Sequence, residues 1–254
     1  MHKKLILVTN DDGIAAPGIL FLSNIAKQFG QVCVVAPDKP QSGMGHAITI
    51  NSTLRAHKTK LHQVDYEYAC SGTPVDCIKF AINKILPRKP DLVLSGINHG
   101  SNLSINVIYS GTMSAAIEGA MEGIPAIGFS LCNYSIEADL SQGEKFIKEI
   151  IKKLLAHKKK ETLCLNVNIP NLKADEIRGI KVCRGAISNW VEEFDERKDP
   201  YGTPYYWLTG NLVNFEKNNT ETDLHLNEQG YVTIVPIGFD MTKHEQIPAL
   251  SKIF

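Results

Sequence analysis

The chain has 254 residues, of which 43% are hydrophobic, which allows one large α/β domain or a domain with an appended lobe. Its 27 Lys and Arg residues balance its 27 Asp and Glu residues, so no overall positive field attracts a nucleic-acid polymer. No apolar run approaches membrane length, and the amino terminus lacks the long apolar segment of a secretory signal. We therefore expect no membrane partner and a location in the cytoplasm.

Strand-like and helix-like runs alternate over the first two thirds of the chain. The predicted strands cover residues 5–9, 31–36, 91–95, 125–131 and 163–168, and the predicted helices cover residues 18–29, 74–85, 113–122 and 143–158. This order is typical of βαβ units and predicts an α/β fold with a Rossmann-like, doubly wound, mainly parallel sheet. Short alternating runs at residues 47–50, 53–56 and 66–70 predict a β-hairpin extension of that sheet.

The pattern changes from residue 171 onward. Strand-like runs at residues 181–184, 205–209 and 231–236 are separated by long polar loops, and loops of this length are usually functional or held by a partner. Aromatic residues, which are enriched at interfaces, cluster in this region. They are Trp190, Tyr201, Tyr205, Tyr206 and Trp207. We predict a single domain over residues 1–254, with a core to about residue 170 and a C-terminal arm that forms a homodimer or homotetramer; a lid is the alternative.

The six cysteines are scattered without a C-x-x-C pair, and most lie in apolar runs. Reduced Cys in such surroundings behaves as a small hydrophobe. We therefore expect core thiols and no zinc site. The residues are Cys33, Cys70, Cys77, Cys132, Cys164 and Cys183.

Two adjacent acids, Asp11 and Asp12, follow the first predicted strand, and Gly13 allows a sharp turn after them. The carboxyl edge of a parallel sheet is where open α/β folds bind ligands, and two like charges at such a place imply a cation. The alternative is that Asp12 only caps the helix that begins near Pro17.

Two further predicted strand ends carry oxygen ligands toward the same edge. Ser42 lies in the Gly-rich loop after the second strand, and Asn98 lies in the turn after strand 91–95. With Asp11 and Asp12, these side chains form a hard-oxygen set that suits one Mg²⁺ or Mn²⁺. Each loop taken alone has a simpler interpretation as a plain turn.

An anion site is predicted at the start of the helix near residue 113. Ser110, Gly111 and Thr112 immediately precede small helical residues, and a helix amino end offers free N–H groups and partial positive charge to a phosphate. We expect Asn102 to be a neighbour in this site. The alternative is that Thr112 is a plain N-cap. Residues 71–74 likewise directly precede a predicted helix. We expect that only one of these two helix starts binds an anion and that the other is a structural cap.

Six motifs in order along nearly the whole chain carry a resemblance to a known family. They are residues 10–13, 36–43, 71–77, 95–100, 109–112 and 230–232. The chain resembles the SurE (stationary-phase survival protein) family of 5′/3′-nucleotidases. The resemblance implies a metal-dependent phosphatase for nucleoside monophosphates that forms dimers or tetramers through its C-terminal arm. It places the cation ligands on Asp11, Asp12, Ser42 and Asn98 of this chain.

The predicted reaction is hydrolysis of a phosphomonoester by a water that the cation activates for in-line attack. Asp11 and Asp12 form the predicted catalytic pair, and Asp11 is the favoured proton acceptor. Residues 110–112 would hold the phosphate. His46 and His99 also lie in these loops, but a turn histidine is more simply explained by a structural hydrogen bond, so neither is assigned a catalytic role.

Two other functions remain open from the sequence. In an aspartyl-phosphate phosphatase, one Asp is the nucleophile and a second acid lies two places later, where this chain has Gly13. A nucleotide-binding regulatory module would bind phosphate compounds without hydrolysing them. The acid pair argues against such a module, because two carboxylates without a cation repel a phosphate.

Overall fold

The computed structural model describes residues 3–157 and 163–254. The strands are β1 (Leu5–Thr9), β2 (Gln31–Pro37), β3 (Ala56–Lys58), β4 (Tyr66–Cys70), β5 (Leu92–His99), β6 (Ala126–Leu131), β7 (Cys164–Ile169), β8 (Gly179–Val182), β9 (Ser188–Lys198), β10 (Pro204–Asn214) and β11 (Tyr231–Pro236). The helices are α1 (Pro17–Ala26), α2 (Pro74–Phe80), α3 (Asn106–Tyr109), α4 (Gly111–Met121), α5 (Glu144–Ala156), α6 (Asp223–Glu228) and α7 (Ile247–Leu250), with a π-helix at Ala81–Ile85 and 3-10 turns at Leu140–Gly143 and His244–Gln246.

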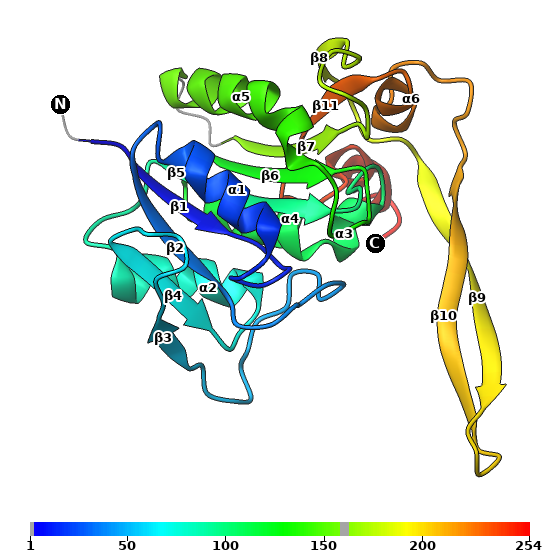
Figure 1. The fold of residues 1–254 in the computed structure, drawn as a ribbon. Helices are drawn as coiled ribbons and strands as arrows, with labels where there is room; N and C mark the ends of the chain where they lie inside the picture. Colours follow the sequence, from blue (N-terminus) through cyan, green and yellow to red (C-terminus); the bar gives the residue numbers. More distant parts are fainter. Residues whose placement is uncertain (1–2, 158–162) are drawn as a thin grey trace.

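A nine-stranded sheet forms the centre of the molecule, in the order β3-β4-β2-β1-β5-β6-β7-β11-β8 (Figure 1). Its neighbouring strands are parallel except at two places, where β3 pairs antiparallel with β4 and β11 pairs antiparallel with β7. The α/β class, the mainly parallel sheet and the edge extension by a short hairpin are therefore confirmed.

The central strands alternate between two hydrophobic clusters. Ile6 and Val8 of β1 pack on one side with α1 and α5, whereas Leu5 and Leu7 pack on the other side with α2 and α4. Helices thus cover both faces of the sheet (Figure 1). Because both faces are buried, the strands read as continuous apolar runs in the sequence.

Several predicted boundaries need correction. Residues 47–50 form an irregular loop and no strand, and the strand predicted at residues 53–56 begins only at Ala56. Strand β5 continues to His99, so Asn98 lies on the strand and not in a turn after it. Helix α1 ends at Ala26, three residues before its predicted end, and Lys158, the predicted last residue of α5, lies outside the described residues.

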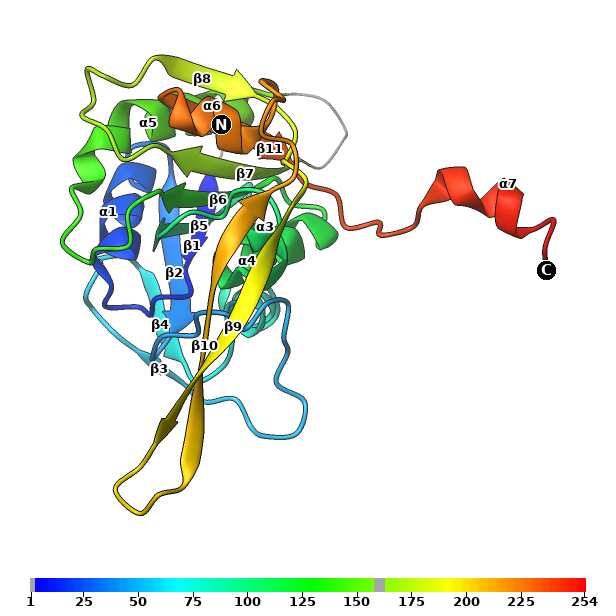
Figure 2. The same ribbon diagram turned by 90° about the vertical axis from the view of Figure 1, so that its right-hand side faces the viewer.

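The C-terminal part differs most from the prediction. Where one short strand and polar loops were predicted, β9 and β10 form a long antiparallel hairpin of 11 residues on each side. The hairpin extends away from the body, and the tail after β11 leads away to α7 (Figures 1 and 2). Helix α6 was not predicted, although Thr222 caps its amino end and Gly230 follows its last turn, which are ordinary signals for a short helix.

All six cysteines are free; four are buried, whereas Cys132 and Cys183 are half-buried. The prediction of core thiols is therefore confirmed for four of them. For the residues that the structure describes, no helix is long and apolar enough to cross a membrane.

Gly18 allows α1 to pack directly on β5. A Cβ at this position would lie 2.0 Å from the carbonyl oxygen of Ile97, which is backbone and cannot rotate away. We expect Gly18→Ala to lower the free energy of unfolding by about 1–3 kcal/mol, because overpacking outweighs the gain in helix propensity. Gly238→Ala, where a Cβ meets nothing within 4 Å, is the matched control. Equal urea midpoints for the two variants would contradict the close contact.

Candidate active site

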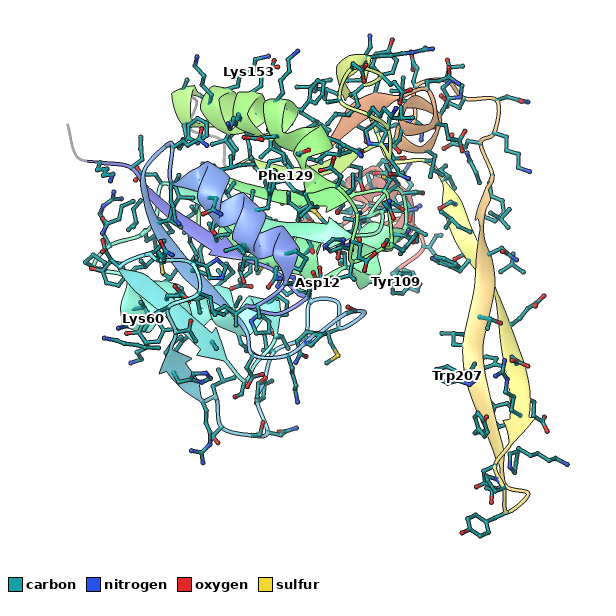
Figure 3. All side chains as sticks on the ribbon, in the orientation of Figure 1. Asp12, Lys60, Tyr109, Phe129, Lys153 and Trp207 are labelled. Atoms are coloured by element: carbon teal, nitrogen blue, oxygen red, sulfur yellow. The ribbon has the colours of Figure 1, made fainter. Side chains whose placement is uncertain are left out.

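A pocket of about 740 Å³ opens at the carboxyl ends of β1 and β5. Figure 3 shows Asp12 and Tyr109, both of which line it, at this end of the sheet. Six of the eight predicted site residues contribute to its lining. They are Asp11, Asp12, Ser42, Asn98, Asn102 and Ser110. The parallel sheet therefore brings together strand ends and loops that are far apart in the chain, as its topology predicts.

Asp11 is held rigidly at the floor of this pocket. Its side chain is 4% exposed and accepts a hydrogen bond from the Thr112 hydroxyl. Its carbonyl oxygen accepts a hydrogen bond of 2.7 Å from the Gln41 backbone N–H. Burial raises the pKa of Asp11 from 3.8 to about 6, the Thr112 hydrogen bond opposes that rise, and the charge of Asp12 adds to it.

Asp12 has a different environment. Its Oδ2 is buried and has no hydrogen-bond partner among the residues described. Burial raises the pKa of Asp12, while the charge and backbone N–H of His99 act in the opposite direction. His99, which sequence reasoning set aside, also lines the pocket, with Nδ1 2.9 Å from the Ser135 carbonyl oxygen. The turn that follows Asp12 has Gly13 at φ 98°, as predicted for a sharp turn.

Asn98 is oriented by its own amide group. Its Nδ2 donates a 2.8 Å hydrogen bond to the Gly100 carbonyl oxygen, so this bond does not use Oδ1. Ser42 is exposed, in the loop whose neighbouring residue Gln41 is bonded to Asp11. The four predicted cation ligands thus lie around one pocket, and the loop that carries Ser42 is tied to Asp11 through the backbone of Gln41.

The amino end of α4 lies against Asp11. Ser110 is the N-cap and accepts a 3.1 Å hydrogen bond from the Met113 backbone N–H, so Thr112 is not the cap. Gly111 is the first helical residue, two residues earlier than predicted. Gly111 and Thr112 do not line the pocket themselves, because both are buried; the Thr112 hydroxyl instead donates to Asp11.

The second junction, at residues 71–74, serves as a structural cap. Thr73 and Asp76 form a capping box at the start of α2, and the Thr73 hydroxyl also donates a 2.7 Å hydrogen bond to the Ala47 carbonyl oxygen. Its polar groups are therefore used within the fold, which leaves the α4 junction as the candidate anion site.

Asn102 is anchored in a buried amide network. Its Nδ2 donates to Ser130 Oγ at 2.8 Å, and its backbone N–H donates to Asn168 Oδ1 at 2.8 Å. Asn166 Nδ2 in turn donates to the Asn102 carbonyl oxygen at 2.7 Å. The network fixes the segment after β5 against β6 and β7, so Asn102 lines the pocket from a rigid position.

Several residues that line the pocket were not predicted from the sequence. Trp190 of β9, Tyr134 after β6 and residues 208–210 of β10 line the same cavity as the acids. No local motif marks these residues as site residues. Trp190 was noted only as one aromatic residue of the arm, yet it lies at the root of the hairpin and faces the pocket.

His46 fixes the Gly-rich loop to α4. Its Nε2 lies 3.0 Å from Glu118 Oε2, and Lys79 Nζ lies 2.5 Å from Glu118 Oε1. Glu118 is only 2% exposed. Burial favours the neutral form of Glu118, but the hydrogen bonds and charges of His46 and Lys79 together outweigh it and lower the pKa of this carboxyl.

Glu118→Gln is expected to lower the free energy of unfolding at pH 7 by about 1–2 kcal/mol, because both partners lose a charged acceptor. A carboxyl with a lowered pKa stabilises the fold fully above its unfolded pKa, so the difference from wild type should begin to shrink near the ordinary value of 4.5 and disappear as the pH falls through the lower pKa of the folded state. A series of urea unfolding curves from pH 7 down through the acid range measures this. Glu122→Gln, which breaks only an exposed pair with Lys89, should change stability by about 0.5 kcal/mol or less.

The comparisons with known proteins agree with this architecture. The family described as "Survival protein SurE" matches residues 6–192. A protein of Christiangramia forsetii named 5′-nucleotidase SurE is 58% identical over 255 residues, covering 99% of this chain and 98% of that one. One of Flavobacterium psychrophilum with the same name is 55% identical over 252 residues, with the same coverage. The crystal structure of SurE protein from Aquifex aeolicus superposes with a TM-score of 0.83 at 38% identity, covering 98% of this chain and 99% of that chain.

The protein has a doubly wound α/β fold, and its acid pair lies in a pocket at the carboxyl edge of the sheet. This edge is where open α/β folds bind their ligands. The chain belongs to the SurE family.

Proposed function

We propose that this protein is a nucleotidase that hydrolyses nucleoside 5′-monophosphates to a nucleoside and phosphate, with 3′-monophosphates as a second class of substrate. The observation that carries the proposal is a pocket lined by the buried carboxylate of Asp11 and the half-buried carboxylate of Asp12, with Asp11 packed against the amino end of α4. The names of the relatives above support the 5′-nucleotidase activity.

We further propose that Asp11, Asp12, Ser42 and Asn98 hold one Mg²⁺ or Mn²⁺ per subunit. The partnerless, buried Oδ2 of Asp12 fits a coordinating oxygen, and Asn98 keeps its Oδ1 for a ligand bond. Among the described residues, no three His, Cys, Asp or Glu side chains are grouped to hold a metal, so the hydroxyl and amide oxygens are needed to complete the set. When bound, the cation neutralises phosphoryl charge and makes a water molecule more acidic.

The residues of the chain then bind and orient the substrate. Gly111 is the first residue of α4, so its backbone N–H has no intrahelical acceptor and can donate to a phosphate oxygen, while Thr112 acts through Asp11, which its hydroxyl and backbone N–H hold. Ser110 and Asn102 line the pocket beside them. Asp11, fixed by the Thr112 hydroxyl, faces the phosphate and is the group we assign to accept a proton from the attacking water.

Phosphate release from 5′- and 3′-nucleoside monophosphates, with Mg²⁺, Mn²⁺ or a chelator, tests this function. We expect release only with metal, and an Asp12→Asn variant that folds normally should lose at least about 100-fold in rate. Removal of outer partners of metal ligands already costs about 10- to 100-fold, so loss of a ligand should cost more. Release that persists in the chelator, or in Asp12→Asn at the wild-type rate, would contradict the metal mechanism.

The same assay separates the two alternatives. A covalent phospho-aspartate trapped during turnover would favour Asp11 or Asp12 as a nucleophile. Metal-dependent nucleotide binding without any release of phosphate would favour a regulatory binding module. The nucleotidase proposal requires release of phosphate without that covalent species.

We also propose that the C-terminal arm joins subunits into a homodimer or homotetramer. The hairpin and the tail expose apolar side chains that a monomer leaves in water. They are Phe194, Tyr201, Trp207, Met241, Ile253 and Phe254. Light scattering after gel filtration should show at least a dimer, and Phe194→Glu should shift it toward the monomer. A wild-type monomer at high concentration would contradict this proposal.

The cytoplasm is the location that we propose. Six free cysteines suit a reducing compartment, where disulfides are rare. Fractionation of the producing cells, with activity measured in each fraction, tests this location; activity outside the cytoplasmic fraction would contradict it.

A further inference from the structure

The pocket that contains the acid pair also has an aromatic wall. We define this wall as Trp190, Tyr109, Tyr134 and Leu208, all of which line the pocket. Sites for drug-sized ligands measure about 300–1,000 Å³. At about 740 Å³, this pocket is far larger than a phosphate group needs. A ligand that fills it must therefore carry a further group that suits an apolar, aromatic surface.

Trp190 is the most firmly held member of the aromatic wall. Its indole Nε1 donates a 2.9 Å hydrogen bond to Asn106 Oδ1. The chain just before it is also anchored, because the Ser188 and Ser104 hydroxyls lie 2.6 Å apart and the Ala186 backbone N–H donates to Asp223 Oδ1 at 2.9 Å. The ring is thus positioned before any ligand arrives, which lowers the entropic cost of binding.

The polar groups beside Trp190 are already engaged. Asn106 Oδ1 accepts from the indole, and the Thr209 hydroxyl donates a 2.9 Å hydrogen bond to the Glu193 carbonyl oxygen. What this side of the pocket offers a ligand is therefore the Trp190 ring and not a free polar group. Flat heteroaromatic rings stack on such rings, by about 1–3 kcal/mol for a nucleic-acid base.

We propose that Trp190 determines specificity by stacking on the base of the nucleoside monophosphate, an inference that rests on the proposed nucleotidase function. Tyr109 connects the two parts of the site, since it lines the pocket and directly precedes Ser110, the N-cap of α4. A nucleotide with its phosphate at the α4 amino end places its base toward the aromatic wall. The root of the hairpin is thus part of the substrate site.

The test compares AMP with ribose 5-phosphate, which keeps the sugar and phosphate but lacks the base. Trp190→Ala should raise KM for AMP about tenfold, the equivalent of 1.4 kcal/mol of stacking, and leave kcat/KM for ribose 5-phosphate within about twofold. Trp190→Phe keeps a ring and should retain most of the affinity for AMP. Val191→Ala is the matched control, because this residue follows Trp190 on β9 but does not line the pocket.

Equal losses on both substrates in Trp190→Ala, or an unchanged KM for AMP, would overturn the stacking role while leaving the nucleotidase function intact. If the wild type hydrolysed neither substrate, the proposed function would fail, and fluorescence would decide the stacking role separately. The chain has two Trp residues, so Trp207→Phe leaves Trp190 as the reporter. AMP with Mg²⁺ should quench its emission saturably and ribose 5-phosphate should not; absence of quenching by AMP overturns the inference.

Discussion

Asp11→Asn is expected to stop phosphate release and, at the same time, to stabilise the metal-free protein. The asparagine Oδ1 can still accept the hydrogen bond from Thr112, so the local geometry is retained. The variant loses the negative charge that we assign to cation binding and proton transfer. We expect the rate of phosphate release to fall at least about 100-fold, for the reason given above for Asp12→Asn.

The gain in stability follows from the cost of burying this charge. Burial raises the pKa of Asp11 from 3.8 to about 6, and each pKa unit corresponds to about 1.4 kcal/mol. A carboxyl whose pKa is higher in the folded state destabilises the fold increasingly as the pH rises from its unfolded to its folded pKa, and by a constant amount above the folded value. The variant should therefore be more stable than wild type by about 1–3 kcal/mol at pH 7, and the gain should disappear as the pH falls through 6 toward 3.8.

Urea unfolding in a chelator, at pH 7 and at pH 4, measures both the size and the sign of this effect. Asp175→Asn, at an exposed position, controls for loss of a negative charge and should leave stability within about 0.5 kcal/mol. With Mg²⁺ added, the wild type should regain stability and Asp11→Asn should not, because only the former binds the cation. If Asp11→Asn were inactive but less stable than wild type in the chelator, the loss of activity would reflect a role of Asp11 in stabilising the fold and not in the reaction.

The sheet was predictable because strands that are buried on both faces have a recognisable hydrophobic pattern in the sequence. In β1 every residue from Leu5 to Thr9 is buried, and alternate side chains enter the two clusters on opposite faces. Such a strand appears as an unbroken apolar run. The strand ends were equally informative, because parallel strands point their carboxyl ends to one edge. Asp11 and Asn98 could therefore be placed near each other although 87 residues separate them.

Residues 47–50 show where periodicity misleads. The alternation of apolar residues there predicts a strand, but Ile48 and Ile50 are exposed, the latter by 76%. The backbone of the neighbouring residues 47 and 49 bonds to side chains instead of to a strand. The Thr49 backbone N–H donates to Asp76 Oδ1 at 3.1 Å, and the Ala47 carbonyl oxygen accepts from Thr73. Side chains at the start of α2 thus hold this segment as a loop, which no local pattern reveals.

The aromatic wall was beyond sequence reasoning for a different reason. Trp190 meets Asn106 across 84 residues, and the contact depends on where the hairpin leaves the body. The strand β9 itself is rich in charge, so apolar alternation does not mark it, and its pairing with β10 sets its length. An aromatic residue in an arm predicts an interface in general, but it does not predict which cavity its ring will line.

Gly111→Ala is expected to lower kcat/KM by about 100-fold with little loss of stability. A Cβ at this first residue of α4 would lie 2.7 Å from Asp11 Cβ and 2.9 Å from Asp11 Oδ2. Asp11 cannot easily move away, because Thr112 and Gln41 hold its carboxylate and its carbonyl oxygen. The new methyl group must therefore displace the carboxylate or the helix end by a few tenths of an ångström or more. Displacements of about 1 Å in an active site can cost about 100-fold in rate.

Stability should change much less than activity in this variant. Alanine is favoured over glycine in a helix by about 1 kcal/mol, which offsets part of the overpacking cost of about 1–3 kcal/mol. Gly119→Ala is the matched control on the same helix, because its Cβ would lie 2.9 Å from Val93 Cγ2 in the core, away from the pocket. It should lower the urea midpoint but keep kcat/KM per folded molecule.

The two variants together separate packing from positioning. If Gly111→Ala lost activity only in proportion to its loss of folded protein, as expected for Gly119→Ala, the close contact between α4 and Asp11 would be ordinary packing. If Gly111→Ala remained folded but lost activity, the helix end and the carboxylate would act as one unit. In that case the absence of a side chain at residue 111 is what allows the proposed phosphate-binding helix and the proposed proton acceptor to share a single pocket.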